Sequence, residues 1–188
     1  MKVGILALQG AFGLHEQVLN RLGVAAVQVR TPEELAEVDR LVIPGGESTA
    51  IAKLLDANRL ADPLADRLAD GLPVLGTCAG MILLASEVVD GYPGQRCFGA
   101  VDVAVRRNGY GRQSESFHAP IDVEGWESPF PGVFIRAPVA ESAGAGVEVL
   151  AELDGVPVLC RQGSAVVSSF HPELADDDRI HRWFVEQE

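Results

Sequence analysis

One cysteine stands in a context that can turn a thiol into a nucleophile. Cys78 lies in the segment GTCAG, residues 76–80, between an apolar segment and a helical pattern. A sharp strand-to-helix turn strains the backbone of its central residue, and only very small residues two positions away leave room for it. The helix N-terminus favours a thiolate, and the amide of Ala79 is placed to donate to an oxyanion. A buried packing cysteine is the alternative interpretation.

A histidine near the C-terminus is the candidate partner of this thiol. His171 follows the apolar segment Ala165–Phe170 and precedes Pro172 and Glu173. Residues two apart in an extended segment point the same way, so Glu173 can orient the imidazole and stabilise its protonated form. Alternatively, the proline and the carboxylate mark only the start of a helix. The remaining histidines are expected to be structural or solvated: His15, His118 and His181.

Two further segments could bind a ligand. In PGGEST, residues 44–49, the glycines allow a backbone amide to approach a ligand and complete an oxyanion hole, and Ser48 could cap the next helix. The segment lacks the G-K-[ST] ending of a phosphate-binding loop. Residues 106–113 (RRNGYGRQ) concentrate three arginines, whose guanidinium groups suit carboxylate recognition, although a solvated hairpin loop is the simpler interpretation.

The first half of the chain alternates apolar runs with helical patterns. The alternation predicts parallel strands, covered by helices on both faces, with ligand sites outside the carboxyl ends of the strands. Leu14, Val18 and Leu22 are expected to form one buried helix face. The expected strands are Val3–Leu8, Val24–Val29, Leu41–Ile43 and Pro73–Gly76; the expected helices are Gly13–Leu22, one opened by a capping box at Thr31–Glu34, Ile51–Leu55, Leu60–Leu68 and Met81–Ala85.

The second half contains short, turn-separated strand patterns. They predict antiparallel additions to the same sheet or a small side sheet, followed by a helix that buries Ile180, Trp183 and Phe184. The expected strands are Ala100–Val105, Phe117–Val123, Val133–Ile135, Val147–Leu153, Val156–Cys160 and Ala165–Phe170. We therefore expect an α/β fold: a flavodoxin-like three-layer sandwich with a mostly parallel central sheet and antiparallel additions in the second half.

Composition excludes several classes of protein. The chain has 188 residues, about one domain's worth, and its 47% hydrophobic and 22% charged residues are typical of a globular domain. A net charge of −12 disfavours nucleic-acid and membrane-surface partners, and no apolar run approaches the ~20 residues of a spanning helix. Three cysteines without C-x-x-C spacing argue against disulfides and zinc, and for the cytoplasm.

In chain order, these motifs resemble those of the triad glutamine amidotransferases, the class I glutaminases. More narrowly, the sequence is similar to the family of glutaminase subunits of the bacterial-type pyridoxal phosphate synthase, over essentially its whole length. The matching segments are 8–10, 44–49, 76–80, 107–113 with 116–117, 134–138 and 169–173. Tyr110 and Glu115 depart from the usual Phe and Asp of this family and affect the expected geometry of their loop.

The resemblance implies that residues 1–188 form a single glutaminase domain. It would hydrolyse L-glutamine to glutamate and ammonia through a thioester on Cys78, without a cofactor or a metal. His171 would be the general base and acid, Glu173 would orient it, and the amides near Gly46 and Ala79 would hold the oxyanion. The implied glutamine-contacting residues are Gly46, Glu47, Ser48, Arg107, Ile135 and Arg136.

The resemblance also implies a partner. Ammonia would pass to a separate (β/α)8 synthase subunit, which makes pyridoxal phosphate from ribose 5-phosphate and glyceraldehyde 3-phosphate, and the free glutaminase would be weak until it docks. Two alternatives stay open. One is a Cys-His hydrolase or peptidase, which would not need an arginine loop. The other is a non-catalytic regulatory subunit, which would be expected to have lost Cys78, His171 or Glu173.

Overall fold

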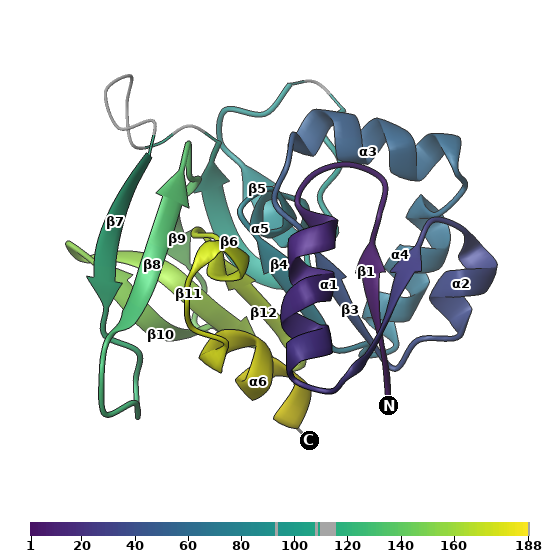
Figure 1. Cartoon of the computed structure of the whole chain (residues 1–188). Helices are drawn as coiled ribbons and strands as arrows, with labels where there is room; N and C mark the ends of the chain where they lie inside the picture. The colour runs from purple at the N-terminus through teal and green to yellow at the C-terminus, as the bar shows by residue number, and fades with distance from the viewer. Residues whose placement is uncertain (93, 108, 110–115, 188) are drawn as a thin grey trace.

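The computed structural model describes residues 1–92, 94–107, 109 and 116–187, and its centre is one seven-stranded sheet. The strands are β1 (Lys2–Leu6), β2 (Ala25–Val29), β3 (Arg40–Ile43), β4 (Val74–Thr77), β10 (Glu148–Leu153), β11 (Val156–Gln162) and β12 (Ala165–Ser168). Their order is β10-β11-β12-β4-β3-β1-β2 (Figure 1). The five strands from β12 to β2 are parallel, whereas β11 and β10 join antiparallel. This confirms the predicted α/β fold.

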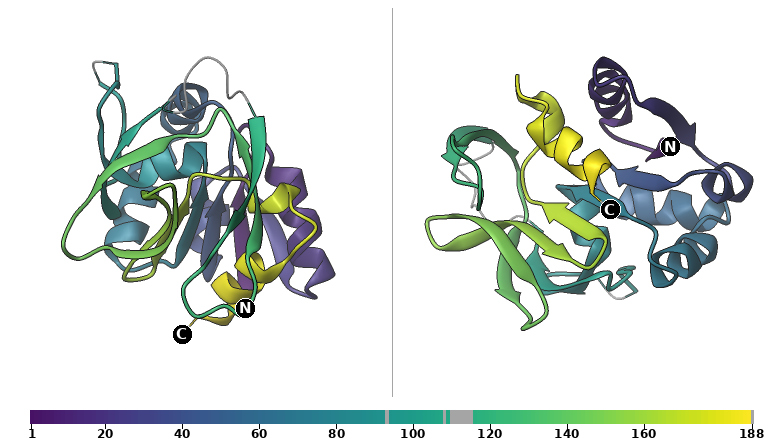
Figure 2. Two further views of the ribbon diagram at one scale, coloured as in Figure 1. Left: turned by 90° about the vertical axis from the view of Figure 1, so that its left-hand side faces the viewer. Right: turned by 90° about the horizontal axis from the view of Figure 1, so that it is seen from below.

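Helices cover both faces of the sheet. They are α1 (Phe12–Arg21), α2 (Pro32–Ala36), α3 (Ser48–Ala57), α4 (Ala61–Ala69), α5 (Ala79–Leu84), a 3-10 turn η1 (Pro172–Leu174) and α6 (Arg179–Glu186). One apolar cluster packs α2 to α5 against one face, and a second packs α1 and α6 against the other. Figure 2 (right) shows α1 and α6 together on one side of the strands. No helix in the described part of the chain is long and apolar enough to cross a membrane.

The predicted helix boundaries have clear local causes. Thr31 and Glu34 form the predicted capping box, with Pro32 at the first helical position. Gly23 and Gly71 follow the ends of α1 and α4 with φ of +72° and +85°, a backbone region that favours glycine.

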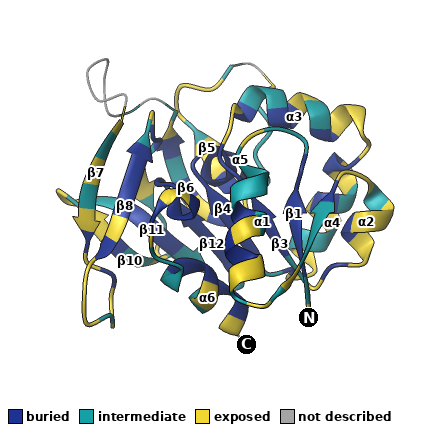
Figure 3. Cartoon of the chain, viewed as in Figure 1, coloured by how far each residue is buried: buried dark blue, intermediate teal, exposed yellow. Residues whose placement is uncertain are grey.

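The buried face of α1 differs from the prediction. Val18 is buried as expected, but Leu14 and Leu22 are only half-buried, and His15 and Leu19 are buried with Val18. The leucine spacing therefore predicted the wrong face of α1 to be buried. The face that packs against the sheet includes a fully buried histidine, His15. In Figure 3 the side of α1 that faces the viewer is intermediate or exposed, whereas the strands of the central sheet behind it are mostly buried.

The second half of the chain forms both arrangements that the sequence left open. Besides β10 and β11, it builds a three-stranded sheet from β5 (Ala85–Val88), β6 (Val101–Arg106) and β9 (Val139–Ala143), and an antiparallel ribbon from β7 (Ser116–Ile121) and β8 (Phe130–Ile135). Two details were wrong in the prediction. Ala85 begins strand β5 rather than ending a helix, and β9 was not expected.

Candidate active site

The turn around Cys78 has the strained geometry that its sequence predicts. Cys78 lies between β4 and α5 with φ +50° and ψ −99°, an unfavourable region for a residue with a side chain. A Cβ at Gly76 would lie 2.8 Å from the carbonyl oxygen of Gly80, and one at Gly80 would lie 2.2 Å from that of Ile43. The amide of Cys78 donates to Ser168 O at 2.8 Å, which ties the turn to β12. Both glycines are therefore required by the turn.

The structure brings Cys78, His171 and Glu173 together. Cys78 and His171 border the same cavity, and a Cβ built on Gly45 would contact both, at 3.4 Å from Cys78 Cβ and 2.4 Å from His171 Cε1. His171 Nδ1 lies 2.7 Å from Glu173 Oε1. All three residues are buried, with 6–8% of their surface exposed. The expected extended backbone is wrong, because Pro172 and Glu173 belong to the 3-10 turn η1. Both interpretations of residues 171–173 therefore hold: they begin a short helical turn, and the Glu173 carboxylate pairs with the His171 imidazole.

The electrostatics of this cluster favour an ion pair. Burial alone would lower the pKa of His171, but the neighbouring Cys78 and the hydrogen-bonded, charged Glu173 raise it to about 10. Burial would raise the pKa of Glu173, but His15 and His171 hold it below its ordinary value. His171 is therefore protonated and Glu173 ionised near neutral pH.

The glycine turn of residues 44–46 packs directly against this cluster. A Cβ on Gly45 would lie 2.4 Å from His171 Cε1, so only glycine fits there. The carbonyl of Gly45 accepts a hydrogen bond from Ala11 N at 3.0 Å. Because a trans peptide points its carbonyl and its N–H in opposite directions, the Gly46 N–H points away from Ala11.

The start of α3 corrects the predicted cap. Glu47, not Ser48, is the N-cap: its carboxylate accepts from Thr49 N at 3.1 Å and Ala50 N at 2.7 Å. Arg107 Nη2 lies 3.3 Å from the same carboxylate. Burial acts to raise the pKa of Glu47, but these two amides and the Arg107 charge hold it below its ordinary value. Glu47 and Arg107 thus place a negative and a positive group side by side.

These residues line one cavity of about 450 Å³. Eight predicted site residues border it: Gly46, Glu47, Ser48, Cys78, Arg107, Ile135, Arg136 and His171. Glu173 does not line it and contacts His171 from the interior, and Ala79 begins α5 directly after Cys78. Arg136 follows β8 with φ +42°, in a strained conformation. Tyr110 and Glu115, which differ from the usual Phe and Asp of the family, lie outside the described residues.

Several residues at this site were not predicted as site residues. Gln9, Ile82 and Leu174 also border the cavity, and Gln9 Oε1 accepts from Glu47 N at 2.8 Å. Gln9 belongs to the matching segment 8–10, which was the available signal. His15 lies behind Glu173, with His15 Nε2 3.3 Å from Glu173 Oε2. His15 was expected to be either structural or solvated; it is fully buried, so the solvated alternative is wrong.

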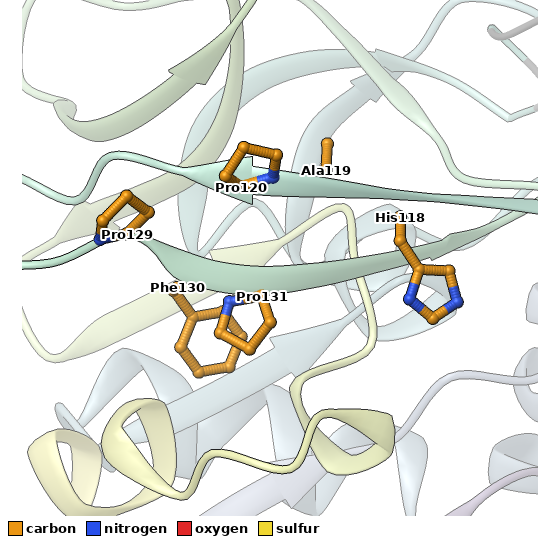
Figure 4. Close-up of a pocket in the computed structure, with 6 residues that line it drawn as sticks. All are labelled: His118, Ala119, Pro120, Pro129, Phe130 and Pro131. Carbon is orange, nitrogen blue, oxygen red and sulfur yellow. The ribbon is translucent and has the colours of Figure 1, made fainter.

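A second hollow lies on the ribbon of β7 and β8. It measures about 440 Å³ and is bordered by His118, Ala119, Pro120, Pro129, Phe130 and Pro131 (Figure 4). The lining is apolar apart from the exposed His118, so it offers no nucleophile or carboxylate. Across residues 1–187, apart from the undescribed positions, no group of three or more His, Cys, Asp or Glu is arranged to hold a metal ion.

Comparison with known sequences decides which family this site belongs to. The profile of the SNO glutamine amidotransferase family matches residues 5–188. The chain belongs to that family. This glutamine amidotransferase is 56% identical over 185 residues to the "Pyridoxal 5'-phosphate synthase subunit PdxT" of Streptomyces coelicolor, covering 98% of this chain and 92% of that protein. It is 50% identical over 188 residues to the protein of that name in Carboxydothermus hydrogenoformans, covering 100% and 97%.

Solved structures agree with this assignment. The amidotransferase superposes on a crystal structure described as a glutamine amidotransferase with a TM-score of 0.92 and 51% identity, covering 98% of this chain and 97% of that one. A protein described as a putative GMP synthase subunit from Thermoplasma acidophilum shares the fold at a TM-score of 0.70 and 18% identity, covering 98% and 92%.

Proposed function

We propose that this amidotransferase hydrolyses L-glutamine and supplies the ammonia for pyridoxal 5'-phosphate synthesis. Membership of the glutamine amidotransferase family and relatives named as subunits of pyridoxal 5'-phosphate synthase support this function. The observation that carries the chemistry is that Cys78 and His171 adjoin the same glycine turn and border one cavity, with Glu173 Oε1 2.7 Å from the imidazole. We assign the whole chain, residues 1–188, to one glutaminase domain.

The chemistry follows from the roles we assign to these three residues. The Cys78 thiolate attacks the side-chain amide carbon of glutamine, and the amides of Gly46 and Ala79 hold the oxyanion. His171 gives its proton to the departing ammonia, and a glutamyl thioester remains on Cys78. His171 then takes a proton from water, which attacks the thioester and releases glutamate. Glu173 keeps the imidazole oriented and stabilises its charged form. No step uses a metal or a cofactor.

The cavity suits a zwitterionic amino acid. Arg107 and Arg136 provide guanidinium groups for the α-carboxylate of glutamine, and the ionised Glu47 faces the same space. Ile135 and Ser48 also line the cavity, and Gly46 lines it with its backbone. A peptidase would need an open cleft for chain on both sides of the scissile bond. The adjoining opposite charges of Glu47 and Arg107 therefore favour free glutamine over a peptide.

The partner we propose is a (β/α)8 synthase subunit in a hetero-oligomeric complex, which receives the ammonia. The relatives' names support a synthase of more than one subunit. We further propose that docking turns the Gly45–Gly46 peptide, whose carbonyl now accepts a hydrogen bond from Ala11 N–H, and so brings the Gly46 amide to the oxyanion. An unchanged peptide orientation in the complex would contradict this gating. Three free cysteines support the cytoplasm as the location.

Ammonia release tests this function. The assay uses glutamine and, separately, a glutamine-containing peptide, each with and without the synthase subunit. We expect release from glutamine only, and much faster release with the partner. Cleavage of the peptide would favour a peptidase instead. Absence of release under all conditions, with partner binding retained, would favour a regulatory subunit.

A further inference from the structure

Behind Glu173 lies a buried histidine pair, His15 on α1 and His181 on α6. Both side chains and the neighbouring Thr77 are fully buried. Polar groups in such a layer are costly unless they are hydrogen-bonded, so their presence on the buried faces of two amphipathic helices needs a reason. The mechanism proposed above uses none of them.

The distances place these groups in a line that ends on the catalytic carboxylate. His181 Nε2 lies 2.8 Å from His15 Nδ1, and His15 Nε2 lies 3.3 Å from Glu173 Oε2. The same nitrogen forms a hydrogen bond with Thr77 Oγ1 at 3.3 Å. Within the described chain, neither Glu173 Oε2 nor His181 Nδ1 has a hydrogen-bond partner. His15 is thus the group positioned to serve the second oxygen of Glu173.

The tautomers follow from the charge at the Glu173 end. An ionised carboxylate can only accept, so the nitrogen of His15 that faces it must carry the proton. His15 Nδ1 is then an acceptor, and His181 donates to it from Nε2. The unpartnered His181 Nδ1 is left without a proton, which avoids a buried, unpaired N–H. In the opposite assignment Thr77 could donate to His15 Nε2, but Glu173 Oε2 would face no donor and His181 Nδ1 would be a buried, unpaired N–H. Burial, which outweighs the attraction of Glu173, lowers the pKa of His15, so this ring is neutral.

We propose that His15, as the neutral Nε2–H tautomer, is a positioning residue that holds Glu173 Oε2 and thereby keeps Oε1 aligned on His171. This inference rests on the proposed glutaminase function. A carboxylate that loses this donor is buried with one oxygen facing no cation or N–H, so it takes up a proton more readily and can turn away from His171. His171 then loses the charge that stabilises its protonated form.

His15 therefore affects how activity depends on pH. The titratable groups that face Glu173 are His171 from its own segment and His15 from α1. Cys78 faces His171, His181 faces His15 from α6, and the Arg21–Asp178 ion pair lies beyond His181. Because loss of His15 raises the pKa of Glu173, the acidic limb of the kcat profile should move to higher pH.

The test compares three variants in the complex with the synthase subunit. His15→Leu removes the donor. We expect kcat to fall about 10- to 100-fold, the size of loss known for removing a hydrogen-bond partner that orients a metal-binding side chain. KM for glutamine should stay within about 2-fold of the wild-type value. His15→Gln keeps an N–H donor and should recover most of kcat. Leu19→Ala, a buried change on the same helix, should lower thermal stability and leave kcat and the pH profile unchanged.

Wild-type kcat and an unshifted pH profile in His15→Leu would overturn the inference, as would equal losses in all three variants. If His15→Leu does not fold, nitrogen NMR of histidine-labelled wild-type protein decides instead. We expect a neutral His15 protonated on Nε2; a neutral ring protonated on Nδ1, or a charged ring, near neutral pH would refute the proposal. Lack of glutamine hydrolysis by wild type in the complex would instead refute the proposed function, and the NMR result would stand independently.

Discussion

His171 Nδ1 lies 2.7 Å from Glu173 Oε1, and this contact leaves the other imidazole nitrogen for Cys78. The two residues are separated by a single proline at the start of a 3-10 turn, so the local backbone itself holds carboxylate and imidazole together. The cysteine comes from a different strand end, 93 positions earlier by residue number (171 minus 78), and β4 and β12 are neighbours in the sheet. The central pairing of the sheet therefore builds the proposed catalytic group.

Replacing the proposed nucleophile should stop hydrolysis. We expect Cys78→Ala to lower ammonia release by at least ~10³-fold while fold and partner binding persist, because no other thiol borders the cavity among the described residues. Ammonia release and circular dichroism measure the two effects. Cys97→Ser is the matched control, since Cys97 is a half-buried free cysteine outside this cavity, and it should keep wild-type activity. Hydrolysis retained in Cys78→Ala would move the nucleophile elsewhere.

The base and its orienting carboxylate should differ in importance. His171→Asn removes the proton carrier, so a loss of about 10²- to 10⁴-fold in kcat is expected. Glu173→Ala should cost less, because Glu173 orients the ring rather than reacting. Steady-state ammonia release in the complex measures both. A Glu173 variant more impaired than the His171 variant would contradict the assigned roles.

The same pair should make stability depend on pH. The folded pKa of His171, about 10, lies above its ordinary 6.5, so its contribution is full below about pH 6.5 and is lost as pH rises toward 10. The pKa of Glu173 is depressed below 4.5, so its contribution is present above that value and is lost as pH falls through the lowered pKa. Urea unfolding of wild type and Glu173→Gln should therefore differ more at about pH 6 than at about pH 9. An equal difference at both would refute the ion pair.

Two glycines should respond oppositely to alanine. Gly45→Ala drives a Cβ to 2.4 Å from His171 Cε1, and we expect a loss of about 1–3 kcal/mol of stability and of most activity. Gly13→Ala, in α1 with open space around it, should instead stabilise the protein by up to about 1 kcal/mol and leave activity unchanged. Thermal unfolding and ammonia release measure the pair. An active Gly45→Ala variant would show that the turn is not pressed against the imidazole.

Substrate binding should depend on Arg107. We expect Arg107→Ala to raise KM for glutamine about 10- to 100-fold with a smaller change in kcat, the value of one charge-assisted hydrogen bond. Its neighbour Arg106 does not border the cavity and pairs with Glu141 at 2.5 Å on the surface. Arg106→Ala should therefore keep the wild-type KM. Equal KM values in the two variants would remove Arg107 from the glutamine site.

The fold was predictable wherever burial leaves a clear pattern. The buried parallel strands β3 and β4 contain the apolar runs 41–43 and 74–76, and the capping box at Thr31 is a purely local signal. Strand β9 was missed because its sequence, VAESA, is short and mostly half-buried or exposed, and pairing with β6 defines it. Tertiary contacts, which the local pattern does not contain, decide such elements.

The site was predictable at the strand ends and not behind them. Cys78 and His171 follow neighbouring strands in recognisable motifs, whereas His15 is an isolated histidine in a helix. Its contact with Glu173 depends on how α1 packs against η1, 158 positions away by residue number (173 minus 15). The sequence pattern of α1 predicted a buried face of leucines, and so it did not indicate that His15 is buried and lies next to Glu173.

The most direct test is to trap the covalent intermediate. Wild-type chain, in complex with the synthase subunit, is mixed with glutamine, quenched in acid and mapped by mass spectrometry. The proposed mechanism predicts a glutamyl adduct on the peptide that carries Cys78, absent from Cys78→Ala and also from His171→Asn, which lacks the proton donor for the departing ammonia. Rapid glutamine hydrolysis without any adduct on Cys78, or an adduct on another residue, would contradict the mechanism.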